Sequence, residues 1–148
     1  MSIRLRKSCR DELPLFRDIA AQPHARRFVL QVSLEGHQKN FDRDDFTYLT
    51  IETESGETAG YFMLVYEQEN DAVEFGRICL DRDHRGIGQQ AIALMEEYCR
   101  AEIGCKFIWL DVFEDNPRGI HIYEKLGYRF LRQEEFEGRQ LFFYGKPL

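Results

Sequence analysis

The sequence has 148 residues, of which 43% are hydrophobic and 14% aromatic, which suits one folded domain and excludes a disordered chain. Its 26 acidic residues outnumber the 20 basic ones, and the net charge of −6 disfavours binding to nucleic acid. Because no apolar run is long enough to span a membrane and no signal-peptide pattern begins the chain, we predict a single cytoplasmic domain over residues 1–148 with no membrane partner.

The first half of the chain predicts helices and an antiparallel meander. Alternating apolar residues indicate strands, and apolar residues three or four positions apart indicate helices. A Glu-Ser-Gly-Glu turn joins two of the strands into a hairpin. The expected elements are a strand over 2–7, a helix over 11–21, one or two short helices within 23–45, and strands over 46–53, 58–67 and 72–80.

The second half alternates helices with strands. The apolar run over 107–113, broken by Asp111, suits a strand that is buried on both faces and pairs in parallel with the strand before the preceding helix. Glycines terminate both helices, and an Asn-Pro pair marks the start of the second. The expected elements are a helix from Ile87 to Cys99 stopped by Gly104, a strand over 107–113, a helix from Asn116 to Gly127, and closing strands over 128–136 and 139–145.

The cysteines and histidines show no pattern of a metal site. The chain has four of each, with no C-x-x-C pair and no spacing typical of metal ligands. A free cysteine without such a pattern is usually a reduced, buried thiol. We therefore predict no metal and mostly buried thiols at Cys9, Cys79, Cys99 and Cys105.

A glycine turn joins the strand over 72–80 to the next helix. Gly86 and Gly88 let backbone N–H groups approach a ligand closely, and the N-terminus of a helix attracts negative charge. Arg85 could add a bidentate contact to a phosphate. The turn therefore predicts a phosphate or pyrophosphate site, although a turn that only leads the chain into the helix explains the same glycines.

The same residues also fit the dinucleotide fingerprint G-x-G-x-x-A, with Asp111 placed to hold a ribose. In a dinucleotide site the strand runs directly into the glycines. Here five charged or polar residues, Asp81 to Arg85, intervene after Leu80. A dinucleotide-binding oxidoreductase is therefore the less favoured alternative.

Two motifs together resemble the GCN5-related N-acetyltransferase (GNAT) family. The first comprises the strand over 73–80, the glycine turn and its helix; it departs from the family at Asp83, where Gln or Arg is preferred. The second and more specific motif is NPRGIHIYEKLGY at residues 116–128, where family members commonly read N-x-x-A-x-x-L-Y-E-K-x-G-F. This motif differs from the family only at Gly119, Ile122 and Tyr128.

The resemblance implies an α/β fold with a mixed, largely antiparallel sheet of about seven strands, a central parallel pair and flanking helices. It also implies acetyl-CoA as co-substrate, with the pyrophosphate on the glycine turn and the pantetheine along the strand over 72–80. The thioester would enter where that strand parts from 107–113. The implied cofactor-binding residues are Ile78, Cys79, Leu80, Arg85, Gly86, Ile87, Gly88, Gln89, Gln90, Asn116, Gly119 and Tyr123.

The reaction would need a base, because an amine attacks a thioester only in its neutral form. A lysine-like amine has a pKa of about 10.4, so its deprotonation at pH 7 costs about 4.6 kcal/mol. Glu74, in the strand before the glycine turn, is the candidate base, with Asp111 as a second candidate. The alternatives are an exposed charge at Glu74 and a structural acid at Asp111.

Tyr123 matches the proton donor of the family, which would protonate the departing thiolate. The alternative is a core aromatic on a helix face. Backbone N–H groups near Ile78 could polarise the thioester oxygen. Cys79 makes an acyl-cysteine conceivable, but direct transfer does not need one.

The acceptor is the least defined part of the prediction. Residues 40–75 carry ten acids and one arginine, which would attract a cationic amine such as a polyamine, an aminoglycoside or a basic peptide; a solvated hairpin face is the simpler explanation. We predict direct acetyl transfer in a ternary complex to a primary amine of a small molecule or a protein N-terminus, with a homodimer kept as an option. The alternative is a non-catalytic acetyl-CoA-binding domain.

Overall fold

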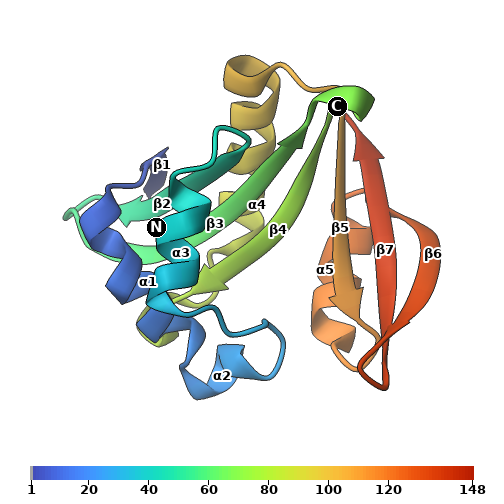
Figure 1. Ribbon diagram of the computed structural model, residues 1–148, viewed down its shortest axis with the longest axis horizontal. Helices are drawn as coiled ribbons and strands as arrows, with labels where there is room; N and C mark the ends of the chain where they lie inside the picture. The colour runs from blue at the N-terminus through green and yellow to red at the C-terminus, as the bar shows by residue number, and fades with distance from the viewer. Residues whose placement is uncertain (1) are drawn as a thin grey trace.

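A mixed sheet with the strand order β1-β2-β3-β4-β5-β7-β6 runs through the structure, and β4 and β5 form its parallel pair. The computed structural model describes residues 2–148 (Figure 1). The elements are β1 (Ile3–Lys7), α1 (Leu13–Ala20), α2 (Pro23–Arg26), α3 (Leu34–Phe41), β2 (Phe46–Thr53), β3 (Thr58–Glu67), β4 (Ala72–Leu80), α4 (Gly88–Tyr98), β5 (Phe107–Phe113), α5 (Pro117–Lys125), β6 (Arg129–Phe136) and β7 (Arg139–Pro147). The predicted fold class is confirmed.

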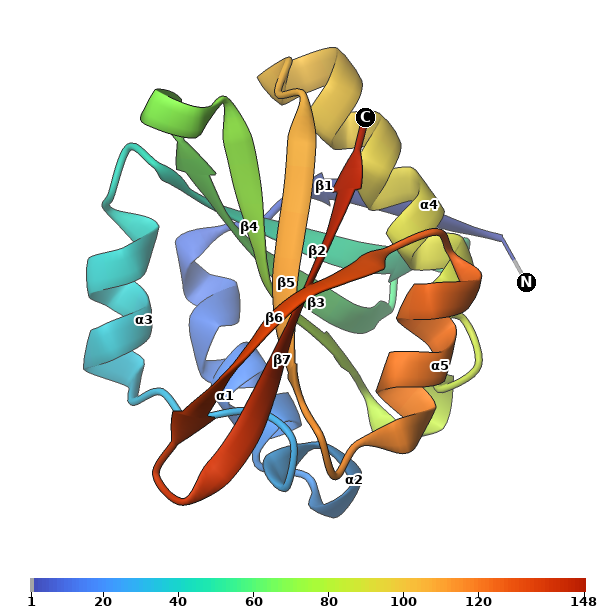
Figure 2. The ribbon, with the colours of Figure 1, turned by 90° about the vertical axis from the view of Figure 1, so that its right-hand side faces the viewer.

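Helices cover both faces of the sheet. α1 and α3 lie on one side, and α4 and α5 lie on the other (Figure 2). The larger core cluster packs α4 against the sheet through fully buried residues such as Met95, Phe62 and Ile108. The smaller cluster places Phe16 of α1 against Tyr61 of β3, with their stacked ring centroids 4.4 Å apart. No helix within residues 2–148 is long and apolar enough to cross a bilayer.

Two predicted elements differ from the structure for local reasons. The helix expected from Asp11 begins at Leu13, because Arg10–Glu12 form a 3-10 turn in which the Glu12 carboxylate accepts the Cys9 N–H at 2.8 Å. The strand over 107–113 was expected to be buried on both faces, and this is wrong for one face. Asp111 is exposed because that face of β5 borders a cavity instead of a helix.

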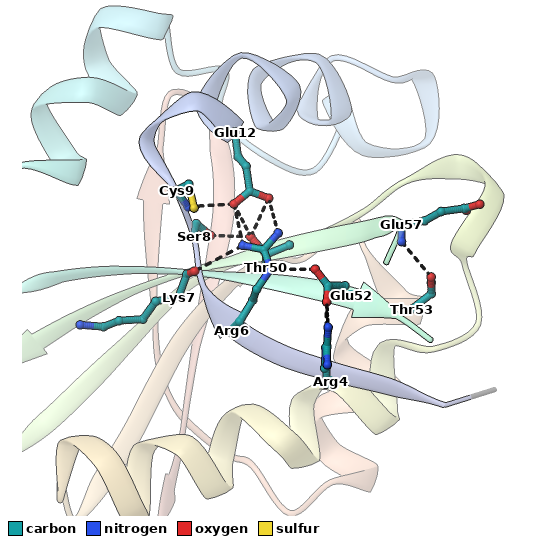
Figure 3. Close-up of polar contacts among 10 residues, drawn as sticks. All are labelled: Arg4, Arg6, Lys7, Ser8, Cys9, Glu12, Thr50, Glu52, Thr53 and Glu57. Carbon is teal, nitrogen blue, oxygen red and sulfur yellow. Dashed lines mark hydrogen bonds and ion pairs between the residues drawn. The ribbon is translucent and has the colours of Figure 1, made fainter. Parts of the chain in front are cut away.

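An ion network holds β1 to β2 (Figure 3). Glu52 of β2 is only 7% exposed and accepts hydrogen bonds from Arg4 and Arg6, the latter at 2.8 Å. The Arg6 guanidinium also donates to both oxygens of Glu12, at 2.8 and 2.9 Å. Arg6 therefore joins the first strand, the second strand and the turn before α1.

A second polar cluster joins α4, α5 and β7. The Glu96 side chain of α4 is buried and accepts from the Tyr128 hydroxyl at 2.8 Å and from the Lys146 ammonium at 3.0 Å. The same ammonium donates to the Leu126 carbonyl at 2.8 Å, beside the C-terminus of α5. Lys146 thus neutralises a buried acid and satisfies a carbonyl at the end of a helix.

The two halves of the sheet part between β4 and β5. Their parallel register extends only from Ala72↔Phe107 to Glu74↔Trp109, and the strands then diverge. A bulge follows in β4, where the register with β3 shifts between Phe75 and Arg77, leaving Gly76 as the extra residue. The parting of the strands opens a cleft in the middle of the sheet, as the family resemblance implies.

Candidate active site

Two cavities lie along this cleft and meet inside it. The first has a volume of about 430 Å³ and lies beside β5, β6 and β7; the second has about 350 Å³ and extends to the glycine turn. The side chains of Tyr123 and Asn116 line both cavities, as do Ile78 of β4 and the loop residues Phe28 and Val29. Tyr123 therefore stands where two ligands would touch.

The β4 backbone turns hydrogen-bonding groups into the second cavity. The Asp81 N–H donates to the Ala59 carbonyl at 2.8 Å, which makes these two residues a hydrogen-bonded pair of β3 and β4. Because such pairs alternate along an antiparallel ladder, the N–H and C=O groups of Leu80 and Ile78 point away from β3. Since β5 has already diverged, these groups are available to an extended ligand, apart from the Leu80 carbonyl, which the His24 ring contacts at 2.7 Å.

Cys79 lies between these two residues but faces the other way. Its side chain is 3% exposed and packs in the smaller core cluster. Burial raises the pKa of the Cys79 thiol to about 11. A thiol in this state is a poor nucleophile, so the geometry does not support an acyl-cysteine.

The glycine turn has the backbone conformation and the adjoining helix N-terminus that an anion cradle would need. Gly86 adopts φ +104°, a conformation that side chains rarely take, and Gly88 begins α4. A Cβ added at Gly88 would meet only the Leu80 side chain, at 3.7 Å, so the fold itself does not require glycine there. Asp83 is exposed and lines neither cavity, which keeps its charge away from the cradle.

Ten of the twelve predicted cofactor-binding residues line the second cavity, and Ile87 and Gln90 lie outside it. Ile87 is 7% exposed and packs in the core, where it anchors the turn, and Gln90 is exposed on α4. The sequence reasoning missed seven residues of this lining, which local patterns do not mark. They are His24, Ala25, Phe28, Val29, Ile92, Arg118 and Ile122.

Asn116 caps α5 as its sequence position predicts. Its side-chain oxygen accepts the Gly119 N–H at 3.0 Å. A Cβ at Gly119 would lie 2.7 Å from the Asn116 side-chain nitrogen, so glycine lets this amide lie against the helix end. The cap sets the direction of α5 and thereby the position of Tyr123, two turns further along.

Three carboxylates line the first cavity: Glu74 of β4, Asp111 of β5 and Glu134 of β6. Burial, followed by repulsion from Asp111 and Glu67, raises the pKa of Glu74 above its ordinary value. Asp111 is open to the cavity, but the surrounding protein still desolvates its carboxyl group, and this desolvation and repulsion from Glu134 raise its pKa. Acids that repel one another in a confined space favour a ligand with positive charge.

The acidic hairpins of residues 40–75 contribute less to this cavity than their charge suggests. Of their ten acids only Glu74 lines it. Glu52 belongs to the β1 network, while Asp42 and Asp45 pair with Arg10 and Arg43. The other two carboxylates of the first cavity, Asp111 and Glu134, come from β5 and β6, which lie far from the hairpins in the sequence.

Tyr123 keeps its proton in this environment. Burial and the nearby Asp111 charge raise the pKa of its hydroxyl to about 12. Its ring packs edge to face against Phe75 and Tyr128, with centroid distances of 6.0 Å to each. Among residues 2–148 no group of three or more His, Cys, Asp or Glu side chains is placed to hold a metal ion.

Comparison with known sequences gives two similarities. A family model described as the acetyltransferase (GNAT) family matches residues 10–128. The spermine/spermidine N(1)-acetyltransferase of Bacillus subtilis is 27% identical over 94 residues, which are 58% of this chain and 62% of that protein. The chain thus matches less than two thirds of the length of this relative.

Solved structures share the whole fold. Spermidine N-acetyltransferase from Vibrio cholerae, in complex with CoA and spermine, superposes with a TM-score of 0.86 at 17% identity, covering 98% of this chain and 95% of that one. A dodecameric structure of the same enzyme in an intermediate state has a TM-score of 0.81 at 19% identity and covers 98% and 93% of the two chains.

Proposed function

Since this chain belongs to the acetyltransferase (GNAT) family, we propose that it transfers the acetyl group of acetyl-CoA to a primary amine of a small, polycationic molecule. One observation carries the proposal. A cavity with an anion cradle and free strand backbone meets a cavity lined by three carboxylates, and Tyr123 lies at their junction. The homodimer option stays a prediction.

Acetyl-CoA fits the second cavity by the chemistry of its lining. The N-terminus of α4 and Arg85 would hold the pyrophosphate. The free backbone groups of Ile78 and Leu80 would pair with the amides of the pantetheine arm, and the backbone near Ile78 would polarise the acetyl oxygen. Acetyl-CoA supplies the activated acetyl group.

The acceptor class follows from charge. Glu74, Asp111 and Glu134 would hold more than one ammonium group, which suits a polyamine better than a monoamine. The B. subtilis relative is named for spermine and spermidine, and the V. cholerae structure contains spermine. These names support a polyamine as the first acceptor to test, with a protein N-terminus as the alternative.

Glu74 would take the proton of the acceptor ammonium, and Tyr123 would give a proton to the CoA thiolate. A carboxylate whose pKa is raised takes a proton from an ammonium more readily than an ordinary carboxylate, directly or through water. The protonated Tyr123 hydroxyl would then donate to the departing thiolate. Because Cys79 is buried and protonated, the acetyl group would pass directly to the amine in a ternary complex.

We expect release of CoA thiol from acetyl-CoA in the presence of spermidine or spermine, and slower release with a diamine. An aminoglycoside and a peptide with a free N-terminus complete the panel.

Saturating acetyl-CoA, at about 100 times its Kd, should stabilise the fold by about 2.7 kcal/mol in a thermal shift, and NAD should not. Stabilisation without turnover of any amine would favour a non-catalytic binding domain, whereas faster turnover of the peptide would contradict a polyamine acceptor.

The cradle can be tested separately with Gly88→Val. We expect Kd for acetyl-CoA, measured by calorimetric titration, to rise at least about tenfold, because a branched side chain would occupy the space where phosphate meets backbone. The melting temperature should change little, because only the flexible Leu80 side chain lies near the added atoms. Unchanged affinity in the folded variant would mean that the turn is structural only.

A further inference from the structure

The segment over residues 22–31, which we call the cover, lies across the cleft and is tied to both halves of the sheet. At one end, Gln22 donates to Asp81 at 2.8 Å and accepts the Arg82 N–H at 2.9 Å, and His24 contacts the Leu80 carbonyl. From the other side, Arg139 of β7 donates to the Arg27 carbonyl at 3.4 Å. The cover includes α2 and the loop after it, which lie near the bottom of Figure 1.

Phe28 and Val29 of the cover line both cavities, so its position shapes both binding sites. At its C-terminal end, over residues 29–31, the cover has no helix or strand, and Leu30 is 52% exposed. The side chain of Leu30 therefore adds little apolar packing that could hold this end in place. Its backbone carbonyl, in contrast, accepts a hydrogen bond from the Arg77 guanidinium.

Arg77 follows the β4 bulge and is 9% exposed. Its second guanidinium nitrogen donates to the Tyr61 hydroxyl at 3.1 Å. Within residues 2–148 Arg77 forms no ion pair, and its guanidinium is hydrogen-bonded to two neutral acceptors, the Tyr61 hydroxyl and the Leu30 carbonyl. An arginine buried in this way is costly, and a hydrophobic side chain would fill the same place more cheaply.

The imidazole of His37, near Arg77 on the inner side, is uncharged. Burial and the charges of Arg77 and Arg17 lower the pKa of His37 to about 4, so this fully buried ring carries no charge at neutral pH. The His37 ring instead hydrogen-bonds to the Tyr48 hydroxyl at 2.7 Å. The Arg77 guanidinium thus donates to the Tyr61 hydroxyl on the inner side and to the Leu30 carbonyl of the cover on the outer side.

We propose that Arg77 is a positioning residue for the acceptor: by holding the Leu30 carbonyl, it keeps Phe28 and Val29 as the wall opposite Glu74 and Asp111. Only the predicted change in KM rests on the proposed acetyl transfer. The position of the cover can be measured in the protein without any ligand. Arg77 also lines the first cavity, and the role proposed for it is to position the cover.

Arg77→Met removes the donors and keeps an unbranched side chain. We expect hydrogen exchange at Phe28 and Val29, the amides of residues 27–33 that donate to the Ala25 carbonyl, to rise about tenfold in the free protein, the change that corresponds to losing one charge-assisted hydrogen bond, with α4 and β5 unchanged. With spermidine as acceptor and saturating acetyl-CoA, KM should rise about tenfold and kcat should change less than about threefold. Arg77→Lys, which retains one donor group, should recover part of both effects.

Tyr61→Phe is the matched control, because it removes the other partner of Arg77 and leaves the Leu30 contact in place. We expect it to lower stability without changing exchange at Phe28 and Val29 or KM. Equal effects from Tyr61→Phe and Arg77→Met would overturn the proposal, as would exchange at the wild-type rate in Arg77→Met. If Arg77→Met does not fold, an effect of Arg77→Lys no larger than that of Tyr61→Phe overturns it. If no amine is acetylated, the exchange result alone still decides.

Discussion

Tyr123→Phe should lower turnover by about a hundredfold or more, the usual scale for losing a general acid. Tyr123 lines both cavities, and burial raises the pKa of its hydroxyl to about 12, so the hydroxyl carries its proton at neutral pH as an ordinary tyrosine does. Phenylalanine preserves the ring contacts with Phe75 and Tyr128, so Kd for acetyl-CoA and the melting temperature should hardly change. The measurement is kcat for spermidine, or for the best amine of the panel.

Tyr144→Phe serves as a control for this substitution. The Tyr144 hydroxyl donates to Glu124 at 2.8 Å and lines neither cavity, so its removal should cost about 1 kcal/mol of stability and leave turnover intact. Turnover close to wild type in folded Tyr123→Phe would remove the acid role. Tyr123 would then be an aromatic wall of the cleft.

The largest loss of stability is expected from Glu96→Ala, at about 3 kcal/mol. The substitution leaves the Tyr128 hydroxyl and the Lys146 ammonium without their shared acceptor inside the packing of α4 and β7. Urea unfolding measures the change in the free energy of unfolding. Glu97→Ala is the matched control, because the neighbouring Glu97 side chain is 67% exposed and pairs only with Arg100.

The control should lose less than about 0.5 kcal/mol, as expected for an exposed ion pair. A similar loss in both variants would mean that helix propensity, and not the buried cluster, sets the effect. A small loss in Glu96→Ala alone would show that Tyr128 and Lys146 find other partners when the carboxylate is absent.

Much of the fold could be predicted from local patterns. The strands over 46–53, 58–67, 72–80 and 107–113 have the expected bounds, because alternation and turn residues mark them within a few positions. The start of α1 was missed because one side chain, Glu12, turns back to the preceding backbone. The segment over 23–45 gave only a vague prediction, since its structure depends on contacts with β4 and β7.

The candidate site divides in the same way. The glycine turn and the capped helix carrying Tyr123 are contiguous in sequence, and their residues could be named in advance. Glu134 and Arg77 could not, because Glu134 reaches the cavity through strand pairing at the far edge of the sheet and Arg77 acts through the loop at Leu30. Local sequence patterns do not give the distances between residues on separate elements.

The short pairing between β4 and β5 also makes the cleft the weakest seam of the molecule. Three residue pairs join the two strands, whereas the unit from β5 to β7 is continuous in sequence and pairs extensively within itself. Sub-global opening that begins at this boundary would release residues 107–148 as one unit, once the cluster of Glu96, Tyr128 and Lys146 that joins α4 to β7 has also broken. Such an opening exposes two strand edges at once, which favours association between copies. The short pairing between β4 and β5 that leaves room for a substrate therefore also lowers the free energy of partial unfolding. A ligand bound between the two strands would fill the cleft and oppose this opening.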